Sequence, residues 1–171
     1  MLNNHFYDIL DLSKLNNLML EGNYFKIQPG FFKNSKNLKS LSLNNNSLTE
    51  IKPDLFEGLA IEFLDLSKNK LTLKPGVFKI FKNLKILLLD SCEIKSLQEK
   101  LFEYNQEITE IFLRYNQLRE LPENIFQNLT KLSRIHLNDN LFKNLTNGIF
   151  NYTNSIKNLD MSQNQFTSIT Q

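Results

Sequence analysis

Residues that build metal centres and disulfides are scarce in this sequence of 171 residues. The chain has one cysteine and two histidines, so it can form no internal disulfide and lacks the ligands of a zinc cluster. Its five glycines are spread out, and no glycine-rich phosphate-binding loop can be traced. We therefore expect no metal, no cofactor and no small-molecule substrate.

Long apolar runs and a strong charge bias are also missing. No segment approaches the roughly 18 apolar residues that span a bilayer, and the N-terminal sequence MLNNHFYDILDL does not have the form of a signal peptide. The net charge is only +2 and the lysines are scattered, whereas nucleic-acid binders concentrate basic residues on one face. The expectation is no membrane segment within this chain and no nucleic-acid partner.

One pattern fills most of the chain, and it returns every 23 or 24 residues. Each unit fits LxxLxLxxNxL, with Ile, Met or Phe replacing some leucines. The units start at Leu15, Leu38, Ile61, Leu84, Ile108, Leu132 and Ile156. Six units later carry an apolar pair that ends in phenylalanine, at Phe32, Phe56, Phe78, Phe102, Phe126 and Phe150. We number the positions of a unit from its first apolar residue.

This pattern resembles the leucine-rich-repeat family over residues 15–171. The resemblance implies an α/β fold class: a right-handed solenoid, or horseshoe arc, with a concave parallel β-sheet and a mostly irregular or short-helical convex side. The segments IQPGFF, IKPDLF, LKPGVF and LPENIF look like the 24-residue repeats of extracellular receptors such as Toll-like receptor ectodomains. Residues 1–14 look like the convex half of a truncated repeat. No cap is found at either end, so we expect a fragment of a longer array or a protein that needs other chain segments or partners.

Alternation of apolar and variable residues predicts one short strand in each unit. The expected ranges are 17–21, 40–44, 63–67, 86–90, 110–114, 134–138 and 158–162. Strands one repeat apart run in the same direction, so they should form a parallel sheet. Proline cannot sit in a central strand, which places the prolines on the return path, and the repeated phenylalanines should stack beneath the outer surface.

Position nine predicts a ladder of buried amides where the chain turns inward. An Asn side chain can donate and accept hydrogen bonds, so it can satisfy backbone groups that the turn would otherwise leave unpaired. The expected rungs are Asn23, Asn46, Asn69, Asn116, Asn140 and Asn164, with Cys92 replacing the fourth one. Cysteine is an accepted alternative at this place in the family, so we interpret Cys92 as a buried, inert thiol rather than a reactive or metal-binding one.

Positions three, five and seven should point outward on the concave sheet, and they supply the candidate binding residues. The terminal units are bland and polar there, whereas Phe63, Ile86, Leu88 and Phe112 would form an apolar patch with Tyr115 near its edge. The expected rim is Asp65, Asp90, Glu110, Arg114, Arg134 and His136. Apolar side chains ringed by charges are typical of protein interfaces.

Two alternatives to a binding role stay open for these residues. Asp65 lies in an LDLS-like segment that the family uses as filler. Phe63 and Ile86 have high strand propensity and could simply pack across strands. The concave surface is therefore weighed against the rim loops and the convex face, which members of this family also use.

Nothing in the sequence predicts an enzyme. His136 and Asp160 share a column and could hydrogen-bond, but the nearby hydroxyls occupy ordinary repeat positions. The favoured function is protein–protein recognition, as part of the ligand-binding ectodomain of a surface or secreted receptor of the immune or adhesion type. The alternatives are an intracellular scaffold that regulates a signalling enzyme, in the cytoplasm, and spacer repeats of a long array.

Glycosylation would favour the extracellular or cell-surface location. Sequons occur at Asn45, Asn128, Asn144 and Asn151. A chain this rich in Asn, Ser and Thr yields such motifs by chance, so they favour that location only weakly.

Overall fold

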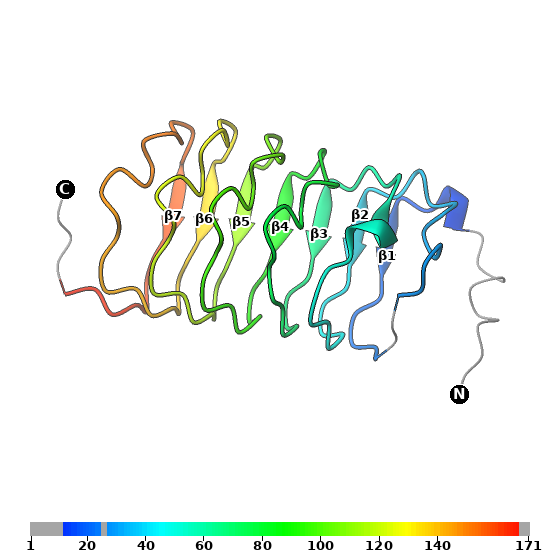
Figure 1. Ribbon diagram of the computed structural model, residues 1–171, viewed down its shortest axis with the longest axis horizontal. Coiled ribbons are helices and arrows are strands. Elements are labelled where there is room, and N and C mark those ends of the chain that lie inside the picture. The colour runs from blue at the N-terminus through cyan, green and yellow to red at the C-terminus, as the bar shows by residue number, and fades with distance from the viewer. Residues whose placement is uncertain (1–11, 25–26, 168–171) are drawn as a thin grey trace.

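The computed structural model of the protein describes residues 12–24 and 27–167. Within these residues the chain forms a coil whose turns follow one another along a single axis (Figure 1). Each turn contributes one strand: β1 (Asn17–Met19), β2 (Ser40–Ser42), β3 (Phe63–Asp65), β4 (Ile86–Leu88), β5 (Glu110–Phe112), β6 (Arg134–His136) and β7 (Asn158–Asp160). Two short 3-10 helices, η1 (Leu12–Lys14) and η2 (Pro53–Phe56), are the helices of the described part.

The strands form one parallel sheet in the order β1 to β7, so each strand pairs only with its neighbours in sequence (Figure 1). The register aligns equal motif positions: Leu41 faces Leu64, and Leu64 faces Leu87. This is the leucine-rich-repeat solenoid that the sequence predicted. Outside the strands most of the described chain is irregular.

Every strand begins at the expected residue and ends two residues before the expected one. The ladder of backbone hydrogen bonds does continue: Leu43 donates to Asp65 at 2.8 Å and Asn45 donates to Ser67 at 2.9 Å. The strands nevertheless stop early because the chain already begins to turn. Position eight takes a left-handed conformation in all the units, with φ of 70° at Gly22, 55° at Asn45, 56° at Lys68, 56° at Ser91, 56° at Tyr115, 57° at Asp139 and 53° at Gln163.

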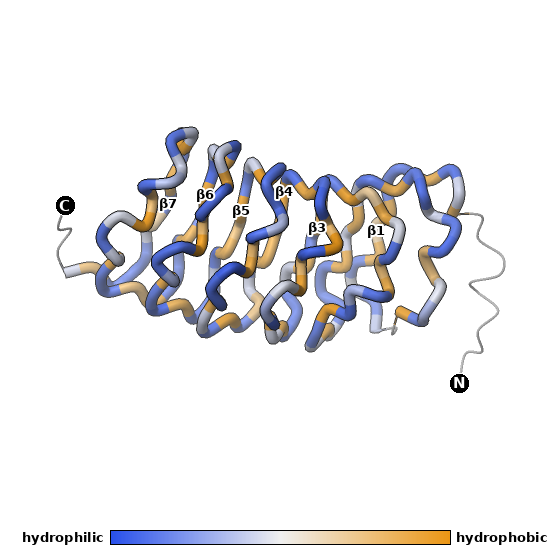
Figure 2. The backbone as a smooth tube through the Cα atoms, turned by 45° about the horizontal axis from the view of Figure 1, so that its top comes forward, coloured by the Kyte–Doolittle hydropathy of each residue, from blue (hydrophilic) through white to orange (hydrophobic). Residues whose placement is uncertain are grey.

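The core fills the coil behind the sheet. Positions one, four and six supply buried leucines and isoleucines, as in the completely buried Leu64, Leu87 and Ile111. Hydrophobic stretches accordingly recur in each turn of the coil, between hydrophilic ones (Figure 2). Burying one such side chain stabilises the fold by roughly 1.5–3 kcal/mol before entropy costs, and each unit buries its residues against its neighbours.

The repeated phenylalanines pack as neighbouring rings on the return path. Three pairs are stacked: Phe32 with Phe56 at 5.6 Å, Phe78 with Phe102 at 5.9 Å, and Phe126 with Phe150 at 5.9 Å between centroids. Phe56 also meets Phe81 edge-on at 5.3 Å. The side of the coil opposite the sheet therefore has an aromatic layer beneath it.

Position nine carries a network of amide hydrogen bonds. Asn116 is representative: its Oδ1 accepts from the backbone N–H groups of Cys92 and Ile94, both at 3.0 Å. Its Nδ2 donates to the carbonyls of Leu89 and Leu113 at 2.8 and 3.1 Å. Asn69, Asn140 and Asn164 also donate through Nδ2 and accept through Oδ1, and Asn46 donates through Nδ2 alone. The exposed Asn23 donates within its own turn.

Cys92 occupies its rung of this network as a free, buried thiol. Its Sγ donates to the carbonyl of Leu66 at 3.3 Å. Burial raises the pKa of the Cys92 thiol to about 11, so the thiol stays protonated at neutral pH. A protonated, enclosed thiol is a poor nucleophile and a poor metal ligand.

Part of one expectation lies outside the described residues. Residues 1–11 belong to the truncated repeat that the sequence suggested, and only its last three residues, Leu12–Lys14, are described, as η1. In the part of the chain that is described, no helix has the length and apolar character needed to cross a membrane.

Candidate functional site

The outward side of the sheet, which we call the concave face, carries the side chains at positions three and five of each unit, with position seven at its margin. In β3, β4 and β5 the middle residue is buried and the two flanking residues are half-buried. This alternation follows from the pleat, because successive side chains point to opposite faces. The sheet therefore presents two parallel columns of side chains to the surroundings.

An apolar cluster lies at the middle of the concave face. Phe63 pairs with Ile86 in the register of β3 and β4, and Leu88 pairs with Phe112 in that of β4 and β5. All four side chains are half-buried. We call Phe63, Ile86, Leu88 and Phe112 the central patch; the register brings these four predicted residues together.

The rim residue Asp90 forms an ion pair with Arg114 beside the central patch. Asp90 Oδ2 accepts from Nε and Nη2 of Arg114 at 2.9 and 2.6 Å, and its Oδ1 accepts from the Arg114 backbone N–H at 2.7 Å. The hydrogen-bonded carboxylate raises the pKa of Arg114 above its ordinary value. The guanidinium also lies 5.4 Å from the centre of the Phe112 ring, so its position is restrained on two sides.

Phe112 also stacks on the rim residue His136. The ring centroids are 4.7 Å apart and the planes are 7° from parallel. His136 Nδ1 lies 3.8 Å from Asp160 Oδ2, which is too long for a hydrogen bond. Asp160 instead accepts from the backbone N–H and the hydroxyl of Ser162, at 3.0 and 2.7 Å, and these bonds lower the pKa of its carboxyl group. The suggested His136–Asp160 hydrogen bond is therefore absent.

The other predicted rim residues are also engaged. Glu110 and Arg134 form an ion pair at 2.8 Å across β5 and β6. Asp65 accepts from the Ser67 backbone N–H at 2.8 Å and from the Asn44 amide at 3.3 Å. The Ser67 contact is the same local bond that Asp160 makes with Ser162, which favours the interpretation of Asp65 as part of a turn.

Tyr115 lies at the edge of this region, directly after Arg114. It is 59% exposed and its φ is 56°, a conformation that costs most for bulky residues. The sequence places an aromatic residue at this edge, but it contains no pattern that reveals the left-handed backbone. Only the comparison of position eight in all the units makes this tyrosine stand out.

The central patch has no counterpart at the N-terminal end of the sheet. There the concave face presents Asn17, Met19, Ser40 and Ser42, with Met19 73% exposed. These residues are small, polar or isolated. The chemically distinctive part of the concave face therefore extends from β3 to β6.

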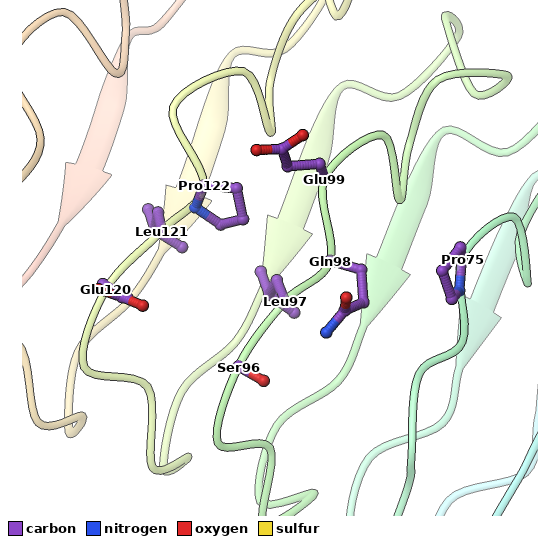
Figure 3. Close-up of a pocket in the computed structure, with 8 residues that line it drawn as sticks. All are labelled: Pro75, Ser96, Leu97, Gln98, Glu99, Glu120, Leu121 and Pro122. Carbon is purple, nitrogen blue, oxygen red and sulfur yellow. The ribbon is translucent and has the colours of Figure 1, made fainter.

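A groove near the middle of the coil lies on the return path, away from the central patch (Figure 3). Its volume is about 630 Å³, and Pro75, Leu97, Glu99 and Pro122 are among the residues that line it. Glu99 stands where the unit beginning at Ile61 has Pro75.

No group of three metal-ligating side chains occurs in residues 12–24 and 27–167. The geometry of the concave face favours non-covalent binding, because polar and apolar groups are displayed on an open surface.

The four sequon asparagines, Asn45, Asn128, Asn144 and Asn151, are all exposed. Asn45 is in the turn after β2, and the other three lie on the return path. Each could therefore be reached by a modifying enzyme.

These features define a repeat solenoid with one open sheet face. The sequence profile of the leucine rich repeat family matches residues 13–71 and 82–142, and the chain belongs to this family. No curated protein sequence matches the chain. Among solved structures, Toll in the Toll–Spatzle complex from Drosophila is similar: 25% identity, a TM-score of 0.80, and coverage of 97% of this chain and 25% of that one.

A second similar structure is the TLR13–ssRNA13 complex. The identity is 26% and the TM-score is 0.80, over 93% of this chain and 22% of that one. The chain thus spans about a quarter of the length of each of these receptors. This chain is a leucine-rich-repeat binding scaffold, and its repeats resemble those of Toll-like receptors. The partner in the first complex is a protein, and the partner in the second is an RNA. The comparison therefore gives no support to the expected exclusion of nucleic acid.

Proposed function

We propose that the chain is part of the ligand-binding ectodomain of a leucine-rich-repeat receptor at the cell surface or in the secreted fraction, and that its concave face recognises a protein. The observation that carries the proposal is the central patch. Four large apolar side chains share one face on three adjacent strands and remain partly exposed. A contiguous apolar cluster on an open sheet face is typical of a surface that a partner covers.

The surroundings of the patch support a protein as the partner. Protein interfaces combine an apolar centre rich in aromatic residues and arginine with a polar rim. Here Phe112 contacts Arg114, and the ion pairs Asp90–Arg114 and Glu110–Arg134 lie beside it. Because these charges are already paired within the chain, they set the shape of the surface without leaving a strong field of either sign.

The test is affinity capture from the source cells with the wild-type chain and a Phe63→Asp, Phe112→Asp double variant. Both changes place a charge in the apolar centre. We therefore expect the affinity for the partner to fall at least about 30-fold, in keeping with loss of an interface hot spot. The matched control is Asn17→Asp, Asn158→Asp, which adds the same charges at position three of exposed sites. Circular dichroism of each variant checks that the fold is kept.

The outcome separates the candidate surfaces. Loss of the partner by the patch variant alone supports the concave face, whereas equal capture by all three proteins assigns binding to the loops or the convex side. Capture of nothing by any of them favours spacer repeats. Nuclease treatment of the extract before capture reveals a partner held through RNA.

The receptor location has a separate test. Expression through the secretory pathway, followed by removal of N-linked glycans, should increase the gel mobility of the chain if Asn45, Asn128, Asn144 or Asn151 is modified. Full binding of a cytoplasmic partner by the unglycosylated protein would favour the intracellular scaffold instead.

A further inference from the structure

Tyr115 is the residue whose conformation and exposure are hardest to explain by the stability of the fold. Position eight is left-handed in every unit, and the other units fill it with Gly22, Asn45, Lys68, Ser91, Asp139 and Gln163. Glycine and asparagine enter this region at little cost, whereas a bulky side chain is disfavoured there. Tyr115 accepts this cost at φ 56° and still leaves 59% of its surface exposed.

The neighbours of Tyr115 hold its backbone firmly in place. Its own N–H donates to the carbonyl of Asn138 at 3.2 Å. Arg114, before it, is fixed by three hydrogen bonds to Asp90. Asn116, after it, is a buried rung of the amide ladder. The exposed ring is therefore carried by a backbone with little freedom, and a preorganised aromatic group loses little entropy when a partner binds it.

Tyr115 also lies next in the chain to a residue that contacts the central patch. Phe112 lies under the Arg114 guanidinium at 5.4 Å, and Tyr115 follows Arg114 directly in the turn. Other exposed tyrosines lack this setting: Tyr104, 53% exposed, lies on the return path. Tyrosine is among the residues that contribute most to protein interfaces, because its ring is apolar and its hydroxyl can hydrogen-bond.

We propose that Tyr115 is a binding anchor and that the partner is a folded protein which covers the central patch and extends over the turn edge beside β5. The partner surface would offer an apolar recess for the ring and a hydrogen-bond acceptor for the hydroxyl at its rim. This inference rests on the proposed function of the concave face, and it adds a contact outside that face.

The stability part of the test needs no partner. Tyr115→Asn replaces a disfavoured left-handed residue by a favoured one, and 59% of the Tyr115 surface is exposed, so the melting temperature should rise by about 1–3 °C. Gln163→Asn, at the same position of another unit, should have a similar or smaller effect. A clear fall in melting temperature of Tyr115→Asn would show that the ring serves the fold, and it would overturn the inference.

The binding part uses benzoylphenylalanine, a photo-crosslinking amino acid, introduced separately at positions 88, 115, 104 and 163 of the full chain. Irradiation in an extract of the source cells should join one and the same protein to positions 88 and 115, and not to 104 or 163. A partner captured in this way should then bind Tyr115→Asn at least tenfold more weakly than wild type. Tyr115→Phe should show a smaller loss, and Tyr104→Asn should bind as wild type does.

The crosslinks also separate the two proposals. A partner joined at position 88 and not at 115 overturns this inference and leaves the concave face as the binding surface. A partner joined at 104 or 163 but not at 88 overturns both. Unchanged affinity of Tyr115→Asn, despite a crosslink at 115, would show that the tyrosine lies near the partner without contributing to binding. That result overturns its role as an anchor.

Discussion

The two sides of the sheet in this protein obey different rules. Facing the core, positions four and six carry an apolar residue in every unit, and position nine is Asn in all units but the one with Cys92. Facing outward, position five is Met19, Ser42, Asp65, Leu88, Phe112, His136 and Asp160. The inward positions repeat because every unit must fit the same neighbour, whereas the outward ones are free to differ. The contrast teaches that identity along the coil reports packing, and variation reports the surface that can acquire specificity.

The same residue type on the two sides gives the largest expected contrast. Phe102→Ala removes a completely buried ring stacked on Phe78, so we expect a loss of about 3–5 kcal/mol in the free energy of unfolding. Phe112→Ala removes a half-buried outward ring and its contacts with His136 and Arg114, which should cost about 1 kcal/mol. Urea denaturation measures both. Equal losses would contradict the division between packing and recognition.

The amide ladder offers a second contrast between a buried rung and an exposed one. Asn116→Ala leaves the N–H groups of Cys92 and Ile94 and several carbonyls without partners in the core, and it should cost about 3 kcal/mol. Asn23 is exposed and bonds within its own turn, so Asn23→Ala should cost less than about 1 kcal/mol. Thermal unfolding of the two variants compares them, and a similar fall in both would argue against the ladder as a shared support.

Backbone strain provides a smaller effect, of opposite sign. Lys100 has φ 60° at the place where Gly30, Gly76 and Gly148 have φ of 84°, 69° and 77°. Lys100→Gly should therefore stabilise the chain by about 0.5–1 kcal/mol, and Gly76→Lys should destabilise it by at least as much. A Cβ atom at Gly76 meets no neighbouring atom closer than 3.9 Å, so the Cβ itself is not crowded there. A loss of stability in Lys100→Gly would show that contacts of the lysine outweigh the strain.

The smallest expected effect is the pH dependence at the surface charges. Lys85 and Lys39 flank Glu62 at 2.7 and 2.9 Å, and their hydrogen bonds lower the pKa of Glu62 from 4.5 to about 2. Because folding favours the ionised carboxylate, its contribution is complete above about pH 4.5 and disappears as the pH falls towards 2. Melting temperatures of wild type and Glu62→Gln should therefore differ slightly at pH 6 and converge near pH 2. A difference that stays constant with pH would contradict this pairing.

Much of the fold could be predicted from the sequence because the same apolar positions recur in every unit and indicate the same local geometry each time. The starts of the strands, the parallel order and the side on which Phe63 and Ile86 lie all follow from the period of the apolar residues. The ends of the strands were predicted two residues too late. The turn at position eight is set by the backbone, and residues as different as Lys68 and Tyr115 accept it, so composition does not reveal it.

The candidate site was predictable only as far as columns and neighbours. That Asp90 and Arg114 lie side by side follows from the register, but their three hydrogen bonds depend on side-chain conformations. His136 and Asp160 are neighbours by the same rule, yet their nearest atoms lie 3.8 Å apart. The sequence does not predict the role of Asn105, which is buried on the return path and donates to the carbonyls of Phe78 and Phe81, each at 2.9 Å. No repeated signal marks it, because the matching place holds Phe81 or Leu129 in other units.

The pairing of each strand only with its neighbours in sequence also bears on how such a chain can change its length. Every inter-strand hydrogen bond joins residues about one repeat apart, so no contact in the sheet depends on the total number of turns. Insertion or deletion of one whole unit by tandem duplication would therefore leave the geometry of the other turns intact. The outward columns could then gain or lose a single row of side chains at a time, and the span of the surface could evolve separately from its chemistry.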